Sequence, residues 1–209
     1  MLSVQRMLGR DDDFCALLEA SAGEGVASVE ALKAVLDRFS ERPSLEAFRA
    51  ARRKEKEISH QLGDLLYSAL VVAMEREDVE ALAEALYKIP KTVEKFAERY
   101  LLSLEQVRAF DFTRQLVLME EATKSVLEMV QAFRAQAGVA ELKRLDARIQ
   151  RLEAEADDVI LEFVRQLFEP DCPSLQAIIL KDLIELNEKV VDRCRDASSV
   201  IARVALKNS

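Results

Sequence analysis

The chain has 209 residues, of which 50% are hydrophobic, and this suffices to bury a core in one domain or two small ones. Its formal net charge of -8 and pI near 5.0 argue against nucleic-acid binding, because a phosphate backbone must be met by an excess of Lys and Arg. Only five Gly and four Pro residues occur, so the chain lacks the turn-forming residues that separate strands and form hairpins. The composition predicts an all-α protein.

The cysteines and the apolar segments indicate the cellular compartment in which we expect the protein. Cys15, Cys172 and Cys194 form no close pair, and we interpret them as free thiols in a reducing compartment. No run approaches the ~20 apolar residues that span a bilayer. The first residues, MLSVQRMLGRDDDF, lack the apolar region and the cleavage site of a signal peptide. We therefore expect a cytoplasmic protein without a transmembrane segment.

Three helices are predicted in the first half from apolar residues that recur every three or four positions: 14–39, 45–74 and 81–102. The acidic residues 11–13 would supply the N-cap and the first turn of the first helix, and Gly23 and Gly25 would weaken its middle. A short break at 75–80 separates the second helix from the third. Pro90 lies inside the third helix and should kink it.

Three more helices are predicted in the second half: 103–136, 141–168 and Leu175 to near the C-terminus. Gly138 would end the first of these helices. The last two are joined by the loop EPDCPS at 169–174, whose two prolines exclude a continuous helix. These two helices would therefore form an antiparallel hairpin.

The two halves resemble each other, which indicates a duplicated three-helix unit. The second and third helices align with the fifth and sixth. The sequence offset between aligned residues differs between these two helix pairs, and the difference falls in the loop between the helices, where insertions are tolerated. The alignment pairs four positions: His60 with Glu153, Asp64 with Asp157, Tyr87 with Glu188 and Lys91 with Asp192. We expect repeats at 1–103 and 104–209, packed as one compact unit.

Paired carboxylates mark the two helices of the hairpin. Glu153 and Asp157 are four residues apart, at the edge of the apolar stripe of their helix. Glu188 and Asp192 repeat this spacing on the last helix. With a rise of about 1.5 Å per residue, the two pairs would lie within about one turn of each other across the hairpin.

Four gathered carboxylates repel one another, because two unit charges about 5 Å apart cost roughly 3 kcal/mol at an effective dielectric of 20. A bound cation makes the electrostatic energy of the gathered carboxylates favourable. Ligands that are all oxygen favour Mg²⁺, Ca²⁺ or Mn²⁺, although carboxylate clusters also hold iron. The competing interpretation is a solvated acidic helix face, and this is the interpretation we give to the neighbouring Glu155 and Asp158.

The segments EAEAD at 153–157 and EKVVD at 188–192 resemble the paired E/D-x-x-x-D motifs of PhoU-like phosphate transport regulators, especially the branch that accompanies low-affinity inorganic phosphate (Pit) transporters. GRDDDFCALLEASA at 9–22 is similar to the start of that branch, and EREDVEALAEAL at 75–86 to its interhelix segment. The resemblance implies two pseudo-symmetric three-helix bundles, each able to carry a surface metal cluster. It also implies a role in phosphate transport and signalling through protein interaction, without a reaction.

The resemblance implies one set of ligands for divalent or iron-type metal ions: Glu153, Asp157, Glu188 and Asp192. The first half departs from the motif, since its corresponding positions are His60, Asp64, Tyr87 and Lys91. The formal charges of these four side chains sum to about zero. Lys91 would take the place of a bound cation by pairing with Asp64. We therefore expect one metal site, in the second repeat, and a degenerate site in the first.

Other motifs argue against an enzyme. His60 is the only histidine, so EISH at 57–60 lacks the second Glu-x-x-His of a di-iron bundle, and nucleophilic catalysis lacks a base. No Gly-rich phosphate loop is present. The basic run RAARRKEKE at 49–57 would suit a membrane surface or a phosphate group, but its interspersed glutamates favour a solvated helix face.

The preferred hypothesis is a non-enzymatic regulator that binds a membrane phosphate transporter or its signalling partner, with peripheral membrane association and a homodimer as further expectations. The competing hypothesis is a metal-free structural helical adaptor unrelated to phosphate. A third is a metal-dependent hydrolase of phosphate compounds, since a bound cation can activate water.

Overall fold

The computed structural model describes residues 2–37, 44–68, 74–107, 109–168 and 172–207, with the backbone alone for 2–11 and 68. Within these residues the chain is all-α and has no strand, which confirms the predicted class. The helices are α1 (Leu2–Asp37), α2 (Glu46–Ser68), α3 (Arg76–Leu102), α4 (Leu104–Val107), α5 (Thr113–Arg134), α6 (Val139–Leu167) and α7 (Ser174–Lys207). None of the described helices combines the length and apolar character needed to cross a bilayer.

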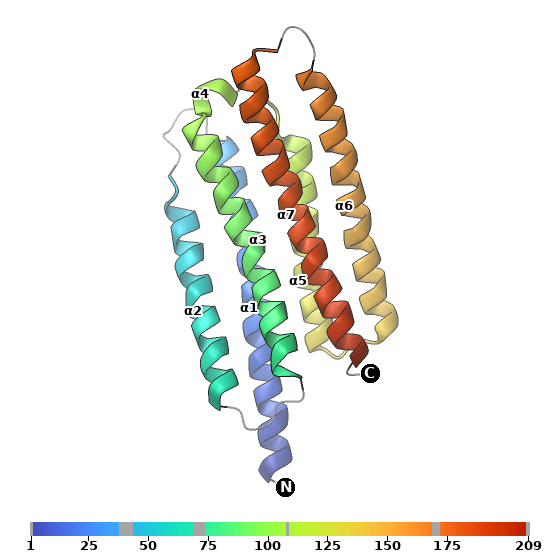
Figure 1. The fold of residues 1–209 in the computed structure, drawn as a ribbon. Coiled ribbons are helices and arrows are strands. Elements are labelled where there is room, and N and C mark those ends of the chain that lie inside the picture. The colour runs from blue at the N-terminus through green and yellow to red at the C-terminus, as the bar shows by residue number, and fades with distance from the viewer. Residues whose placement is uncertain (1, 38–43, 69–73, 108, 169–171, 208–209) are drawn as a thin grey trace.

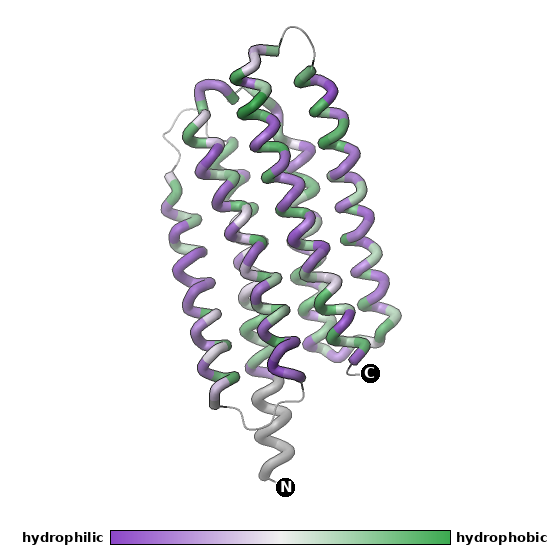
Figure 2. Tube along the Cα trace, viewed as in Figure 1, coloured by the Kyte–Doolittle hydropathy of each residue, from purple (hydrophilic) through white to green (hydrophobic). Residues whose placement is uncertain are grey.

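The long helices run side by side in two layers. In Figure 1, α2, α3, α7 and α6 form one layer, and α1 and α5 lie behind it. The centre of the bundle is the contact between α3 and α7, while α1 packs on α2, α3 and α5, and α5 packs on α6 and α7. Polar and apolar residues alternate along every helix in Figure 2, as expected for helices that each bury one stripe. The two predicted halves therefore share one continuous core.

An aromatic cluster joins the halves at one end of the bundle. The ring of Phe112, just before α5, meets Phe96 of α3 edge to face, with 5.5 Å between centroids. Tyr100 lies 5.9 Å from Phe112. Phe110 contacts both Phe112, at 4.7 Å, and Phe163 of α6, at 4.8 Å. These rings connect α3, the α4–α5 segment and α6 in one contact network.

The start of α1 was predicted wrongly. The helix begins at Leu2, so the acidic residues 11–13 lie inside it instead of forming its cap. A contact with α5 helps to hold this turn, because Nε of Arg134 lies 2.8 Å from Oδ1 of Asp12. The helix also continues through Gly23 and Gly25. Residues 38 and 39, where the predicted helix ends, lie outside the described part.

The predicted break at 75–80 is helical from Arg76 onward. Glu77 and Asp78 occupy the first turn, where the helix dipole favours negative charge. Both carboxylate oxygens of Asp78 also lie 3.0 Å from Nζ of Lys207, at the end of α7. The helix continues through Pro90, and the kink stays a prediction. The predicted end of the preceding helix, 69–73, lies outside the described residues, and Met74 is not helical.

The helix predicted at 103–136 is divided into α4 and α5. The side chain of Asp111 explains the division, since its Oδ1 accepts hydrogen bonds from N of Thr113 at 2.9 Å and from Oγ1 of Thr113 at 2.5 Å. Such a bond from side chain to backbone replaces the helical pattern and starts a new helix. Phe112 then turns into the core. The predicted continuous helix is therefore wrong at this segment.

The end of α5 also differs from the prediction. The helix ends at Arg134, and Gln136 has a left-handed backbone with φ of 54°. N of Gln136 donates to O of Phe133 and N of Ala137 to O of Ala132, which is a Schellman motif. Gly138 is instead the N-cap of α6. The predictions for α6 and α7 agree with the structure to within two residues at the boundaries that it describes.

Candidate functional site

The predicted carboxylates lie on α6 and α7, which pack closely along their length. Glu153 is half-buried and Asp157 is exposed on α6, next to the buried stripe of that helix. Glu188 and Asp192 are both half-buried on α7. Figure 1 shows the two helices antiparallel, as the register across the hairpin requires. Glu155, one of the two acids assigned to solvent, is exposed as predicted.

The other three carboxylates act electrostatically on Glu188. Burial raises the pKa of Glu188, and the charges of Asp192, Asp157 and Glu153 raise it further. Lys189 opposes this effect but does not outweigh it. The register predicted from the helical rise therefore brings the two pairs into one electrostatic cluster, which we call the acidic cluster.

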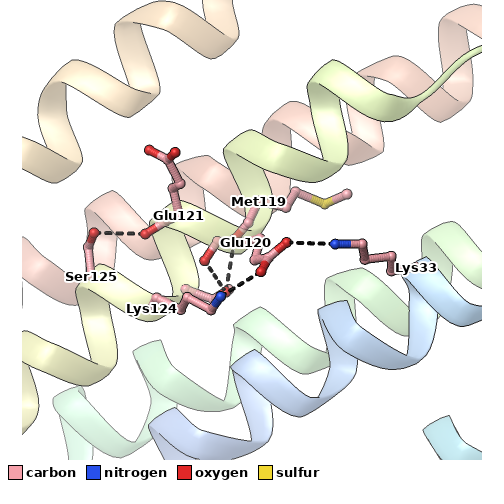
Figure 3. A network of polar contacts seen from close by, with 7 residues as sticks. Lys33, Met119, Glu120, Glu121, Lys124 and Ser125 are labelled. Carbon is pink, nitrogen blue, oxygen red and sulfur yellow. Dashed lines mark hydrogen bonds and ion pairs between the residues drawn. The ribbon is translucent and has the colours of Figure 1, made fainter.

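An ordinary paired carboxylate of the same bundle behaves in the opposite way. Figure 3 shows Glu120 of α5, which accepts hydrogen bonds from Lys124 at 2.5 Å and from Lys33 of α1 at 3.3 Å. These bonds lower the pKa of Glu120. Glu188 has no such hydrogen bond to a cation in the described part of the chain, and its pKa is raised first by its burial and then by the neighbouring carboxylates.

One member of the acidic cluster does have a cation beside it. Nε of Arg195 on α7 lies 3.2 Å from Oε1 of Glu153 on α6. The two atoms form an ion pair by distance, but Nε has no hydrogen-bond partner and is buried. Asp157, Glu188 and Asp192 have no ion pair or hydrogen bond to any side chain in the described part of the chain. Sequence reasoning missed Arg195, because its reach to α6 depends on the spacing between the helices.

The side chains do not form a ready metal cage. In the described residues, no three His, Cys, Asp or Glu side chains come together in a way that could hold a metal ion. The chemistry of the donors nevertheless fits a hard cation, since three unpaired carboxylates supply oxygen ligands and their mutual repulsion is relieved by positive charge. Binding would require new side-chain rotamers at the cluster. The metal site therefore stays a prediction.

The corresponding positions of the first half look different. His60 and Asp64 are exposed on α2, and Tyr87 and Lys91 are half-buried on α3. No ion pair joins Lys91 to Asp64 among the described side chains; Nζ of Lys91 lies 5.5 Å from the ring centroid of Tyr87 instead. The guanidinium of Arg52 also lies over this ring, at 4.8 Å. Cations therefore gather where the second half has carboxylates.

Sequence reasoning also missed a buried acid within the basic run. Glu55 is 2% exposed, and its Oε1 accepts a hydrogen bond of 2.8 Å from Oγ of Ser21 on α1. Burial raises the pKa of Glu55 despite this bond. A signal was available, because Glu55 lies seven residues from both Phe48 and Leu62, on the buried stripe of α2.

Comparison of the chain with models of protein families and with curated proteins gave no match. None of the three cysteines forms a disulfide in the described part of the chain, as predicted, and Cys194 is fully buried. Burial raises the pKa of the Cys194 thiol, which makes this group unreactive as a thiolate.

Proposed function

We propose that the protein is a non-enzymatic, PhoU-like regulator of inorganic phosphate transport, which binds a membrane phosphate transporter or its signalling partner and holds a metal at the acidic cluster. In this proposal α1 to α3 and α5 to α7 are the two repeats. The observation that carries it is the gathering of Glu153, Asp157 and Asp192 around the half-buried Glu188, whose pKa is raised by its burial and then by these three charges. A fold gains nothing from gathering uncompensated charge, so the cluster calls for a cation.

The metal is tested by titration of the purified protein with Mn²⁺ and by metal analysis after purification. The test variant carries Glu153→Gln and Asp157→Asn. The control carries Glu155→Gln and Asp158→Asn, which change the same residue types on the same helix at exposed positions. We expect the first variant to lose Mn²⁺ binding and the second to keep it. Equal affinity in both variants would show that the acidic cluster is not a metal site.

The partner would be contacted through exposed apolar residues at the loop end of α6 and α7. Phe168, Leu175 and Ile178 are 84%, 63% and 66% exposed, whereas soluble monomers seldom gather large apolar side chains on their surface. Leu175 and Ile178 are three residues apart and share one face of α7. A membrane-embedded partner with an apolar surface would cover them.

Co-purification from membranes tests the partner. The tagged protein is expected to retain a phosphate transporter, identified by mass spectrometry, and the double variant Leu175→Ser/Ile178→Ser to release it. A matched variant on an exposed polar position of α7, Lys181→Ser, should retain it. Absence of any phosphate transporter or phosphate-signalling protein would refute the role in phosphate transport, even if the metal binds.

The metal-free structural adaptor remains the second candidate, and the ion pair between Arg195 and Glu153 favours it. This pair neutralises part of the acidic cluster from within the protein. If Mn²⁺ does not bind and a partner unrelated to phosphate is retained at the apolar end, the adaptor is the correct function.

A further inference from the structure

A cleft of about 930 Å³ lies between α2 and α3. The corresponding helices of the second half, α6 and α7, pack closely along their length. In Figure 1, α2 stands at the edge of its layer. A volume of this size is typical of sites for small organic ligands.

One end of the cleft is cationic. Arg52, Arg53 and Lys56 of α2 all line it. Nε of Arg52 lies 2.9 Å from a carboxylate oxygen of Glu94, and Nη2 of Arg53 lies 2.9 Å from one of Glu46. Lys56 has no ion pair in the described part of the chain. Arg76 also lines the cleft, as do Glu55, Glu80 and Glu84, so the four basic side chains of the lining exceed the three acidic ones by one.

Two polar atoms at this end lack a partner. Nη1 of Arg52 and Oε2 of Glu55 are buried and have no hydrogen bond among the described residues. Burial raises the pKa of Glu55, so this carboxyl group takes up a proton more readily than a free glutamate does. Nη1 of Arg52 requires an acceptor, and leaving a buried donor unsatisfied costs stability.

The rest of the cleft has an apolar wall beside the polar side chains of Ser59, His60, Glu80 and Glu84. Leu62 and Leu66 of α2 and Val79 and Ala83 of α3 belong to this wall. Gly63 also lines the cleft, and a Cβ built at this position would meet no atom within 4 Å. The site accordingly combines an anion-binding end with an apolar wall.

We propose that this cleft binds an organic phosphate monoester, with the phosphate at Arg52 and Lys56 and the apolar body along Leu62, Leu66 and Ala83. A phosphate oxygen supplies the acceptor that Nη1 of Arg52 lacks. The apolar wall and the volume favour an organic ester over inorganic phosphate. The proposal does not depend on the acidic cluster or on the proposed role in phosphate transport, because it concerns other helices and another ligand.

Titration calorimetry with phenyl phosphate, adenosine 5′-monophosphate and inorganic phosphate tests this proposal at constant ionic strength. We expect at least one ester to bind about tenfold more tightly than inorganic phosphate, since only the ester fills the apolar wall. Binding of neither ester at millimolar concentration would overturn the proposal. Equal binding of inorganic phosphate and the esters would also overturn it, in favour of a simple phosphate site.

Variants locate the site. Lys56→Gln should weaken ester binding about tenfold, whereas Lys95→Gln, an equal charge change on an exposed position of α3, should not change it. Gly63→Leu should abolish binding by filling the cleft without loss of thermal stability. Unchanged binding in Gly63→Leu would overturn the cleft as the site.

Vesicles of phosphatidylcholine with phosphatidic acid separate a lipid ester from a soluble one. If Gly63→Leu reduces co-sedimentation with these vesicles, the cleft takes the lipid headgroup and the proposal holds with a lipid as its source. The opposite outcome is that wild type and Gly63→Leu bind the vesicles equally while the soluble esters do not bind. In that case the surface charge of α2, and not the cleft, recognises phosphate, and the proposal fails.

Discussion

Nε of Arg195 lies 3.2 Å from Oε1 of Glu153, so one carboxylate of the acidic cluster already has a cation beside it. Arg195 therefore competes with any metal ion for Glu153. We predict that Arg195→Gln strengthens Mn²⁺ binding, because the variant frees one ligand and removes a positive charge nearby. A gain of about threefold to tenfold is expected for a partly exposed pair. Calorimetric titration with Mn²⁺ measures the change.

The control for this prediction is Arg203→Gln. Arg203 is exposed on the same helix, and no ion pair of the described residues joins it to the acidic cluster. Its substitution changes the net charge equally and should leave the Mn²⁺ affinity close to that of the wild type. Weaker Mn²⁺ binding in Arg195→Gln would contradict the competition and assign Arg195 a supporting role.

Glu188 should destabilise the metal-free protein at neutral pH. Its pKa is raised by burial and by three neighbouring carboxylates, so the folded state favours the protonated form. This contribution to stability is present below the unfolded pKa of about 4.3 and is lost as the pH rises through the folded pKa. Glu188→Gln should therefore raise the free energy of unfolding at pH 7 by about 0.5 kcal/mol, after allowance for solvent screening.

Urea unfolding in the presence of a chelator, between pH 4 and pH 8, measures this effect. The difference between wild type and Glu188→Gln should shrink toward the acid end. Glu185→Gln is the control, because Glu185 is exposed and accepts a hydrogen bond from Lys181. A stability difference that grows toward acid pH would have the wrong sign for a raised pKa.

The helices that were predicted well are those with long, regular apolar stripes. In α6 the buried residues recur every three or four positions without interruption, so local pattern and tertiary packing agree. The division of α4 from α5 depends on one bond from Asp111 to Thr113, which has no periodic signature. The turn of α1 that contains Asp12 is held by a contact with Arg134, more than a hundred residues away. Local reasoning cannot anticipate such a contact.

The electrostatic grouping of the acidic cluster followed from helical rise alone, because two antiparallel helices with a short loop have a nearly fixed register. The pairing of Arg195 with Glu153 did not, since a long side chain can reach several neighbours. The cleft between α2 and α3 was equally inaccessible, because interhelix spacing depends on packing that the apolar pattern leaves open. Buried Glu55 could have been found from its place on the stripe.

Two mid-helix glycines should respond oppositely to alanine. At Gly63 an added Cβ meets open space, so Gly63→Ala should stabilise the protein by about 0.5–1 kcal/mol through the better helix propensity of alanine. At Gly25 the Cβ would lie 3.2 Å from Cγ2 of Ile89 on α3. Gly25→Ala should be neutral or destabilise by about 1 kcal/mol, because the close contact must open. Urea unfolding compares them, and equal stabilisation would disprove the tight α1–α3 approach.

Gln136 holds a backbone conformation that suits glycine. Its φ of 54° places it in the left-handed region, where a side chain costs about 1 kcal/mol. Gln136→Gly should therefore raise the free energy of unfolding by about 1 kcal/mol while keeping the Schellman hydrogen bonds of Gln136 and Ala137. Ala135→Gly is the matched comparison, because Ala135 has φ of -74° and an exposed side chain, and it should lose about 0.5 kcal/mol. Thermal unfolding of both variants decides the matter: destabilisation by glycine at 136 would mean that α5 does not end in this motif.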